Sequence, residues 1–213
     1  MAPHEAWQLQ GNVAELYQRH LVPAITAIWA EELVARAAPA AGERVLDLAC
    51  GTGIVARLAA LRMGSGEVVG LDINASVLAV ARSLPAPAGV AVTWHEGSAL
   101  DMPFADGVFD VCLCQLGLQF FPDPAAALRE MARLLRSDGR LVLSVYDAIE
   151  TTPLALALSE ALDRRIRPGA SATKRAEHAM SDPEALRALA SRAVSSRSRT
   201  SAASGVAVSW MRA

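Results

Sequence analysis

The stretch Val45–Gly53, VLDLACGTG, decides the fold of this chain, together with VVGLDI at residues 68–73. A short apolar run reaches Asp47, the chain turns through two glycines, and the helical pattern IVARLAALR follows. A second apolar run then ends in Asp72. We therefore expect a strand, a glycine turn, a helix and a parallel strand with a terminal acid, which together form a βαβ unit.

The acids beside the turn indicate which ligand such a unit would bind. Gly51 and Gly53 let the backbone turn sharply and approach a ligand, because no Cβ stands in the way. Asp72 lies where a carboxylate can accept both hydroxyls of a ribose. A pyrophosphate prefers backbone N–H groups without a carboxylate beside them. Asp47, at the mouth of the turn, instead favours a ligand with an ammonium and a sulfonium, and S-adenosylmethionine combines both with ribose and adenine.

A second interpretation of the same turn stays open. GTGIVA also fits the relaxed dinucleotide pattern G-x-G-x-x-G/A, which is weak evidence by itself. An NAD(P)-dependent Rossmann oxidoreductase is therefore an alternative. Asp47 argues against it, as does the absence of a Tyr-x-x-x-Lys pair, since the only lysine is Lys174. A non-catalytic domain that keeps the fold as a binding or scaffolding partner is a further alternative.

Composition describes a globular chain of one domain. It has 213 residues, of which 53% are hydrophobic and 20% charged, with a net charge of −2. A net charge this close to zero does not indicate binding to nucleic acid. No apolar run reaches the ~18 residues that a membrane span needs. The N-terminus also lacks the pattern of a signal peptide. We expect a cytoplasmic protein without a metal site, in which Cys50, Cys112 and Cys114 are buried free thiols.

Strands and helices alternate along the chain. Apolar runs predict strands at 43–49, 67–73, 90–95, 108–115 and 140–146, and helical spacing predicts helices at 53–63, 75–84 and 123–136. This alternation predicts an α/β fold: a Rossmann-like, doubly wound, mostly parallel sheet with helices on both faces. Residues 12–38 are expected to form one or two helices, the second starting at Pro23. From this segment Tyr17 or His20 could reach the ligand cleft, or the helices could simply pack.

Several motifs in order resemble one known family. VLDLACGTG and LDIN are similar to the first two motifs of the class I S-adenosylmethionine-dependent methyltransferases. EGSALDMPFADGVFDVCLCQLGLQFFPD and ALREMARLLRSDGRLVLSVY match the stretches that follow. The resemblance runs from about Ala14 to Leu189 and is strongest to the group related to the ubiquinone and menaquinone C-methyltransferases. It implies methyl transfer from S-adenosylmethionine to a small, largely apolar acceptor.

The resemblance also implies which residues bind the cofactor. They are Asp47, Gly51, Gly53, Asp72, Ile73, Ser98, Ala99 and Gln115. The aspartate and glycines of the turn would surround the methionine end, Asp72 would take the ribose hydroxyls, and Ile73 would flank the adenine. Ser98 stands where the family commonly has an acid that accepts from the adenine amino group, so this contact should be weaker here. Gln115 would lie near the reacting methyl.

The acceptor side is less defined. The segment 115–122, QLGLQFFP, is apolar with two amides and could line an acceptor pocket or be a buried connection. Tyr146 and Asp147 could face the acceptor. Within residues 147–180, an amphipathic helix that could form a lid is predicted for the stretch TTPLALALSEALDRRIRP. His95 is expected to be packed or partly exposed, without a catalytic partner. No residue is identifiable as a catalytic base.

These patterns divide the chain. A methyltransferase domain is expected at 1–190, with an N-terminal helical cap (1–42), a cofactor-binding core (43–146) and an acceptor-side helical region (147–190). Residues 191–213 are rich in Ser, Ala and Arg and are expected to be a disordered tail.

The tail replaces the two antiparallel strands with which relatives complete the sheet. This change suggests a premature or frame-shifted terminus. Only GVAVSWM, residues 205–211, is suited to a strand. The edge of the fifth strand would then be open, with homo-oligomers formed through it.

Overall fold

A computed structural model describes residues 12–197 and 206–208, and it contains a six-stranded sheet in the order β3-β2-β1-β4-β5-β6. All paired strands run parallel. The strands are β1 (Arg44–Leu48), β2 (Gly66–Asp72), β3 (Val90–Glu96), β4 (Phe109–Gln115), β5 (Leu135–Ser144) and β6 (Val206–Val208). The expected doubly wound parallel sheet is therefore confirmed.

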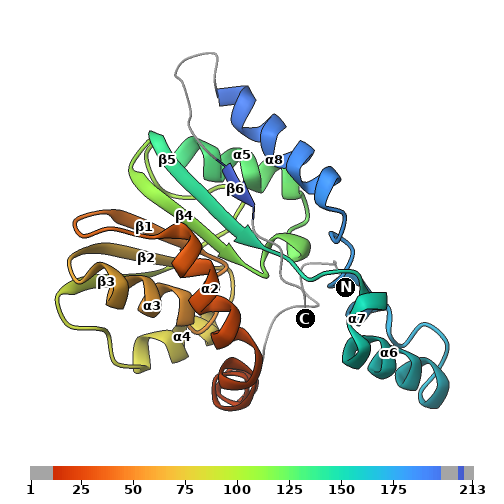
Figure 1. Cartoon of the computed structure of the whole chain (residues 1–213). Helices are drawn as coiled ribbons and strands as arrows, with labels where there is room; N and C mark the ends of the chain where they lie inside the picture. The colour runs from red at the N-terminus through yellow and green to blue at the C-terminus, as the bar shows by residue number, and fades with distance from the viewer. Residues whose placement is uncertain (1–11, 198–205, 209–213) are drawn as a thin grey trace.

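Helices cover both faces of this sheet (Figure 1). On one face lie α2 (Ala27–Ala37), α3 (Ile54–Met63) and α4 (Ala75–Ser83), and on the other α5 (Pro124–Leu134) and α8 (Pro183–Arg197). Alternate residues of each strand point to opposite faces. Val45, Val111 and Val142 pack with α2 and α3, whereas their neighbours Leu46, Cys112 and Leu141 pack with α5. The three cysteines are buried and free, as expected.

The N-terminal segment is helical, but its second helix does not begin at Pro23. Between α1 (Val13–Leu16) and α2 lies a π-helix, η2 (Tyr17–Thr26), which contains Pro23. Proline has no N–H to continue the α-helical ladder, and the wider turn is seen where the N–H of Ala27 donates to the carbonyl of Val22. The sequence pattern identified the helices but not this change of pitch.

The fifth strand starts earlier than expected. The structure assigns Leu135–Ser144 to β5, although the strand was expected to start only at residue 140. The pairing of the early part of β5 is irregular: Phe109 pairs with Leu135, but Val111 already pairs with Arg140. The added residues loop out of the pairing, as in a β-bulge.

The C-terminal expectation needs correction. Residues 191–197 continue α8, and Val206–Val208 form β6, which pairs with Leu141–Leu143 of β5. Leu186, Ala190 and Ala193 are buried in a stripe at helical spacing, and α8 lies against α5. Small alanines make such a stripe hard to recognise in a Ser/Ala/Arg-rich sequence. The strand runs parallel to β5, so the edge is not open over these residues; residues 198–205 and 209–213 lie outside the described part.

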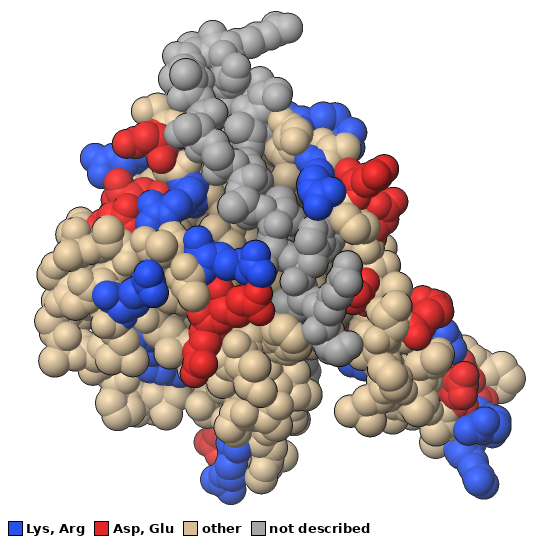
Figure 2. Space-filling view, in the orientation of Figure 1, with Lys and Arg blue, Asp and Glu red and all other residues tan. Residues whose placement is uncertain are grey.

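Beyond the carboxyl end of β5, the chain forms η4 (Ile149–Thr151), α6 (Pro153–Arg165) and α7 (Ala172–Ala176), and these helices project away from the sheet (Figure 1). The short helix η3 (Leu118–Phe120) follows β4. On the face drawn in Figure 2, acidic and basic side chains of the described residues are interspersed. Within the described ranges, no helix is long and apolar enough to cross a membrane.

Candidate functional site

Three residues of the turn after β1 have left-handed backbone conformations, with positive φ. Ala49 has φ 55°, Gly51 54° and Gly53 83°. Around Gly51 no atom lies within 4 Å of the place that a Cβ would take, so its outer side is open. Gly53 is different, because a Cβ there would overlap the ring of Trp94, 2.1 Å away. The missing side chain of Gly53 thus makes room for Trp94, whereas Gly51 leaves space for a ligand.

Asp72 lies directly against this turn. Its Oδ2 accepts from the N–H of Gly51 at 2.8 Å, and its Oδ1 accepts from the N–H of Asn74 at 2.9 Å. A carboxylate can accept about four hydrogen bonds, so Asp72 retains acceptor capacity for a ligand. Burial raises the pKa of Asp72, while the backbone hydrogen bonds oppose the rise. The strand-end pattern predicted Asp72 as a ribose ligand; its hydrogen bond to the turn is a further contact that the structure shows.

Asp47 is more deeply buried than its predicted role suggested. The residue is 1% exposed, and its Oδ2 accepts from the N–H of Ala56 in the first turn of α3 at 2.9 Å. Burial raises its pKa to about 8, and the charge of Asp72 adds to the rise, whereas Arg57 opposes it. Without a ligand, Asp47 is therefore mostly protonated at neutral pH. A bound cation beside it would favour the charged form.

The predicted adenine contacts follow β2 and β3. Ile73 is 54% exposed and free to cover a ring. Ser98 Oγ accepts from the N–H of Leu100 at 3.1 Å, so part of its acceptor capacity serves its own turn. Ala99 is 8% exposed and packs in the core. Ala99 can therefore offer a ligand mainly its backbone, a distinction that the sequence alone did not make.

Gln115 connects the end of β4 to the N-terminal helices. Its Nε2 donates to the carbonyl of Thr26 at 2.8 Å. Tyr17 lies in the same region: burial raises its pKa, a hydrogen bond to Thr26 opposes this, and the charge of Asp72 adds to it. Of the two N-terminal candidates, Tyr17 is half-buried beside the site and His20 is exposed. The helical segment thus closes one side of the strand ends.

These residues fit S-adenosylmethionine. The open side of Gly51 gives the backbone a close approach, and Thr52 Oγ1 is buried without a hydrogen-bond partner in the described structure. Two acids, Asp47 and Asp72, flank the turn, which suits a cationic ligand better than a pyrophosphate. The site also lies at the point where the strand order reverses, between β1 and β4, where ligands of such sheets bind. When bound, S-adenosylmethionine supplies a methyl group activated by its sulfonium.

Several further buried polar atoms lack a hydrogen-bond partner within the described residues. Among the described residues, buried polar atoms without a hydrogen bond include Gln18 Oε1, Gln119 Oε1, Ser144 Oγ and His178 Nε2. They come from η2, η3, the end of β5 and the segment after α7. Gln119 belongs to the apolar segment 115–122, for which an acceptor pocket was an open alternative. His178 was missed, because nothing in its local sequence distinguishes it.

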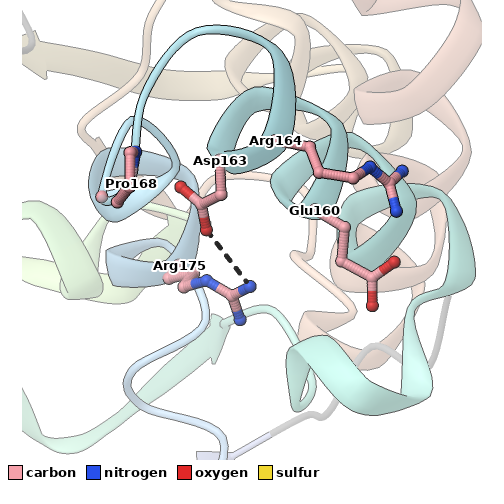
Figure 3. Close-up of a pocket in the computed structure, with 6 residues that line it drawn as sticks. Glu160, Asp163, Arg164, Pro168 and Arg175 are labelled. Atoms are coloured by element: carbon pink, nitrogen blue, oxygen red, sulfur yellow. Dashed lines mark ion pairs between the residues drawn. The ribbon is translucent and has the colours of Figure 1, made fainter.

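A separate hollow lies between α6 and α7 (Figure 3). It is lined by charged residues of α6 and by the loop to α7, and Asp163 forms an ion pair with Arg175 across it at 3.7 Å. Asp163 also accepts from the N–H and Oγ of Ser171 at 2.9 and 2.7 Å. None of the predicted cofactor residues lines this hollow. Its contacts join α6 to α7, which is a structural role.

The close approach of Gly117 to the turn after β1 gives a prediction about packing. Gly117 follows β4, and a Cβ there would lie 2.7 Å from Ala49 Cβ and 2.9 Å from Cys114 Sγ. We expect Gly117→Ala to lower the free energy of unfolding by about 1–3 kcal/mol through overpacking. Adding Ala49→Gly removes one of the two clashes, so the double variant should regain part of the loss in urea unfolding. Equal stability of the wild type and Gly117→Ala would contradict this packing.

Comparisons with known proteins agree with this site. The methyltransferase domain family matches residues 46–143. The chain is 33% identical over 180 residues to the 2-phytyl-1,4-naphtoquinone methyltransferase of Synechococcus elongatus, covering 81% of this chain and 76% of that protein. It is 40% identical over 115 residues to the demethylmenaquinone methyltransferase of Thermus thermophilus, covering 54% of this chain and 52% of that one.

Solved structures extend the likeness to three dimensions. An S-adenosylmethionine-dependent methyltransferase from Mesorhizobium loti is 29% identical, with a TM-score of 0.51, covering 58% of this chain and 54% of that one. One from Thermotoga maritima has a TM-score of 0.60 at 23% identity, covering 85% and 76%, and shows the shared fold. The chain therefore belongs to the class I S-adenosylmethionine-dependent methyltransferases. Its cofactor is S-adenosylmethionine, and nothing in the comparisons supports the oxidoreductase alternative.

Proposed function

We propose that this enzyme methylates a hydroxylated aromatic ring of the quinol type that carries an apolar side chain. The observation that carries the proposal is the 33% identity, over 81% of the chain, to a relative named for a phytyl naphthoquinone. A quinol offers hydroxyls to polar partners and a flat apolar ring to apolar walls. We infer that both kinds of surface contact the acceptor beside the cofactor.

The acceptor side of the molecule supports this choice. Leu154 and Leu158 of α6 are 79% and 48% exposed, and Ile28 of α2 is 61% exposed. Apolar side chains of this size suit a long hydrocarbon tail, because each removes apolar surface from water on contact. The unpaired atoms of Gln119 and Ser144 suit the ring hydroxyls. We infer that the acceptor enters beside α6, with its ring toward the end of β5.

The cofactor residues keep the roles that we proposed for them from the sequence. Asp72 would hold the ribose hydroxyls, Gly51 and Asp47 the methionine end, and Ile73 the adenine. The chain aligns the acceptor with the methyl group and excludes water, and orientation alone can supply several kcal/mol of the barrier (~7–11 in favourable cases). A cytoplasmic location stays a prediction.

The experiment is a methyl-transfer assay with a matched pair of acceptors. Purified protein and S-adenosylmethionine are incubated with a demethylated prenyl naphthoquinol and, separately, with the same ring without its tail. We expect a product heavier by one methyl group from both, with a lower KM for the prenylated acceptor. Calorimetric binding of S-adenosylhomocysteine without any methylated quinol would overturn the proposed acceptor. It would then favour the alternative of a non-catalytic binding domain.

A further inference from the structure

His178 lies after α7, and its ring is fixed by one hydrogen bond. The side chain is 5% exposed, and Nδ1 lies 2.6 Å from the backbone carbonyl of Asp147. A carbonyl can only accept, so Nδ1 must carry the hydrogen. In the neutral imidazole, the lone pair then belongs to Nε2, at the opposite edge of the ring.

Nε2 has no hydrogen-bond partner in the described structure although it is buried. A buried acceptor without a donor carries a desolvation cost that no hydrogen bond offsets. The hydrogen bond from Nδ1 to the carbonyl of Asp147 is enough to anchor the segment after α7. That bond does not explain why the side chain also has a buried acceptor at Nε2. A ligand that donates to Nε2 would remove the cost.

The surroundings place this atom on the acceptor side of the cofactor site. The ring of His178 lies 5.0 Å from that of Tyr146, two residues beyond β5. Strand alternation puts Tyr146 and Ser144 on the same face as Val142, the face that α2 covers. Gln115 is paired with Ser144 in the sheet, and it holds the carbonyl of Thr26.

The charges around His178 balance each other. Lys174 Nζ lies 5.4 Å from the centre of the Tyr146 ring and forms an ion pair with Glu177 at 2.6 Å. Tyr146 itself stays a neutral phenol, because burial, followed by the charges of Glu177 and Tyr17, raises its pKa to about 12. None of these groups is hydrogen-bonded to Nε2.

We propose that His178 Nε2 receives the proton of an acceptor hydroxyl in this enzyme. The O–H bond breaks, its electron pair stays on the oxygen, and the proton forms an N–H bond at Nε2. The ring becomes an imidazolium and the acceptor a phenolate, so charge is conserved, and the electron-rich acceptor is then ready to take up the methyl group. This rests on the proposed function, since it requires a hydroxylated aromatic acceptor, and it narrows that class to rings with an ionisable hydroxyl.

The test uses 4-nitro-1-naphthol, whose anion absorbs visible light, so that ionisation is measured without turnover. The probe is added to wild-type protein saturated with S-adenosylhomocysteine, and its absorbance is recorded as a function of pH. We expect the pKa of the bound probe to fall by about one unit or more, because imidazolium formation stabilises the anion.

Two variants separate proton uptake from anchoring. His178→Asn keeps a side-chain amide that can donate to the carbonyl of Asp147, but it lacks an atom at the Nε2 position. Tyr146→Phe keeps the ring beside His178 and removes a different polar atom. We expect the asparagine variant to bind S-adenosylhomocysteine as the wild type does and to leave the bound probe's pKa at its solution value, whereas the phenylalanine variant still lowers it.

The outcomes are distinct. An unchanged pKa of the bound probe in the wild type, or no saturable binding, would overturn the role of His178. A lowered pKa that persists in a well-folded His178→Asn would overturn it too. Ionisation of the probe together with no methylation of any quinol would leave the proton site standing and remove the proposed function instead.

Discussion

Asp72→Ala is expected to weaken S-adenosylhomocysteine binding by about 2–4 kcal/mol, or roughly 30- to 1,000-fold in Kd. The carboxylate is expected to accept charge-assisted hydrogen bonds from both ribose hydroxyls. It also holds the N–H of Gly51 at 2.8 Å, so the variant loses the ligand contacts and the support of the turn together. Isothermal titration calorimetry measures the change.

Glu96→Ala is the matched control for this variant. Glu96 pairs with Asp72 in the sheet, ends the neighbouring strand β3 and is exposed. The Glu96→Ala variant removes the same charge from the same edge of the sheet, but at an exposed residue. We therefore expect the free energies of unfolding and of ligand binding to change by less than about 0.5 kcal/mol. If both variants bind the ligand as tightly as the wild type, the ribose lies elsewhere. If both lose affinity equally, the effect is one of overall charge.

Asp47→Asn is expected to act in opposite directions on stability and on binding. In the folded protein burial raises the pKa of Asp47 to about 8, whereas in the unfolded chain it returns to its ordinary value of 3.8. Between these values the folded state holds a proton that the unfolded chain has released. The contribution of this proton to stability is complete below about pH 4, declines as the pH rises, and is lost above about pH 8.

Asparagine does not titrate, so the variant should not show this decline. At pH 8 we expect its free energy of unfolding to exceed that of the wild type by about 2–4 kcal/mol. This is less than the full shift would give at ~1.4 kcal/mol per pKa unit, because the new amide N–H₂ must also be buried. Urea unfolding at pH 5, 6.5 and 8 measures the difference. A difference that stays constant with pH would contradict the buried, protonated carboxyl.

Cofactor binding should change the other way. A cationic ligand beside Asp47 favours the carboxylate, so binding to the wild type near pH 7 should release a proton, visible as heats that depend on the buffer's ionisation enthalpy. The variant should release none and bind about 10- to 100-fold more weakly, the loss expected for one charge-assisted hydrogen bond. Proton release by Asp47→Asn equal to that of the wild type would assign the titration to another group.

The sequence alone determined the frame of the cofactor site. Apolar runs ending in acids and a glycine turn are local signals, because strand burial and left-handed backbone are properties of a few neighbouring residues. They predicted that Asp72 ends the second strand, whereas the hydrogen bond from the N–H of Gly51 to its Oδ2 was seen only in the structure. The N-cap at Asp123 is a local feature of the same kind, since its side chain accepts from the N–H of Ala126 three residues on.

Some site details needed the tertiary structure although their residues were identified in advance. The ring of Trp94, from β3, fills the space beside Gly53, and Ala99 is buried in the core. Sequence spacing gives a residue's position along the chain, but which side chain fills a gap depends on neighbours far away in sequence. The same holds for the high pKa of Asp47, because burial is a property of the assembled fold.

Only the tertiary structure decided what lies around the acceptor side. A π-helix brings the carbonyl of Thr26 to Gln115, β6 pairs in parallel with β5, and a loop after α7 brings His178 beside Tyr146. Each of these contacts joins segments that are distant in sequence. The residues involved show no periodic pattern from which the contact could be predicted. The physical reason is that local sequence sets backbone preference, whereas long-range contacts depend on which surfaces remain to be covered once the sheet has formed.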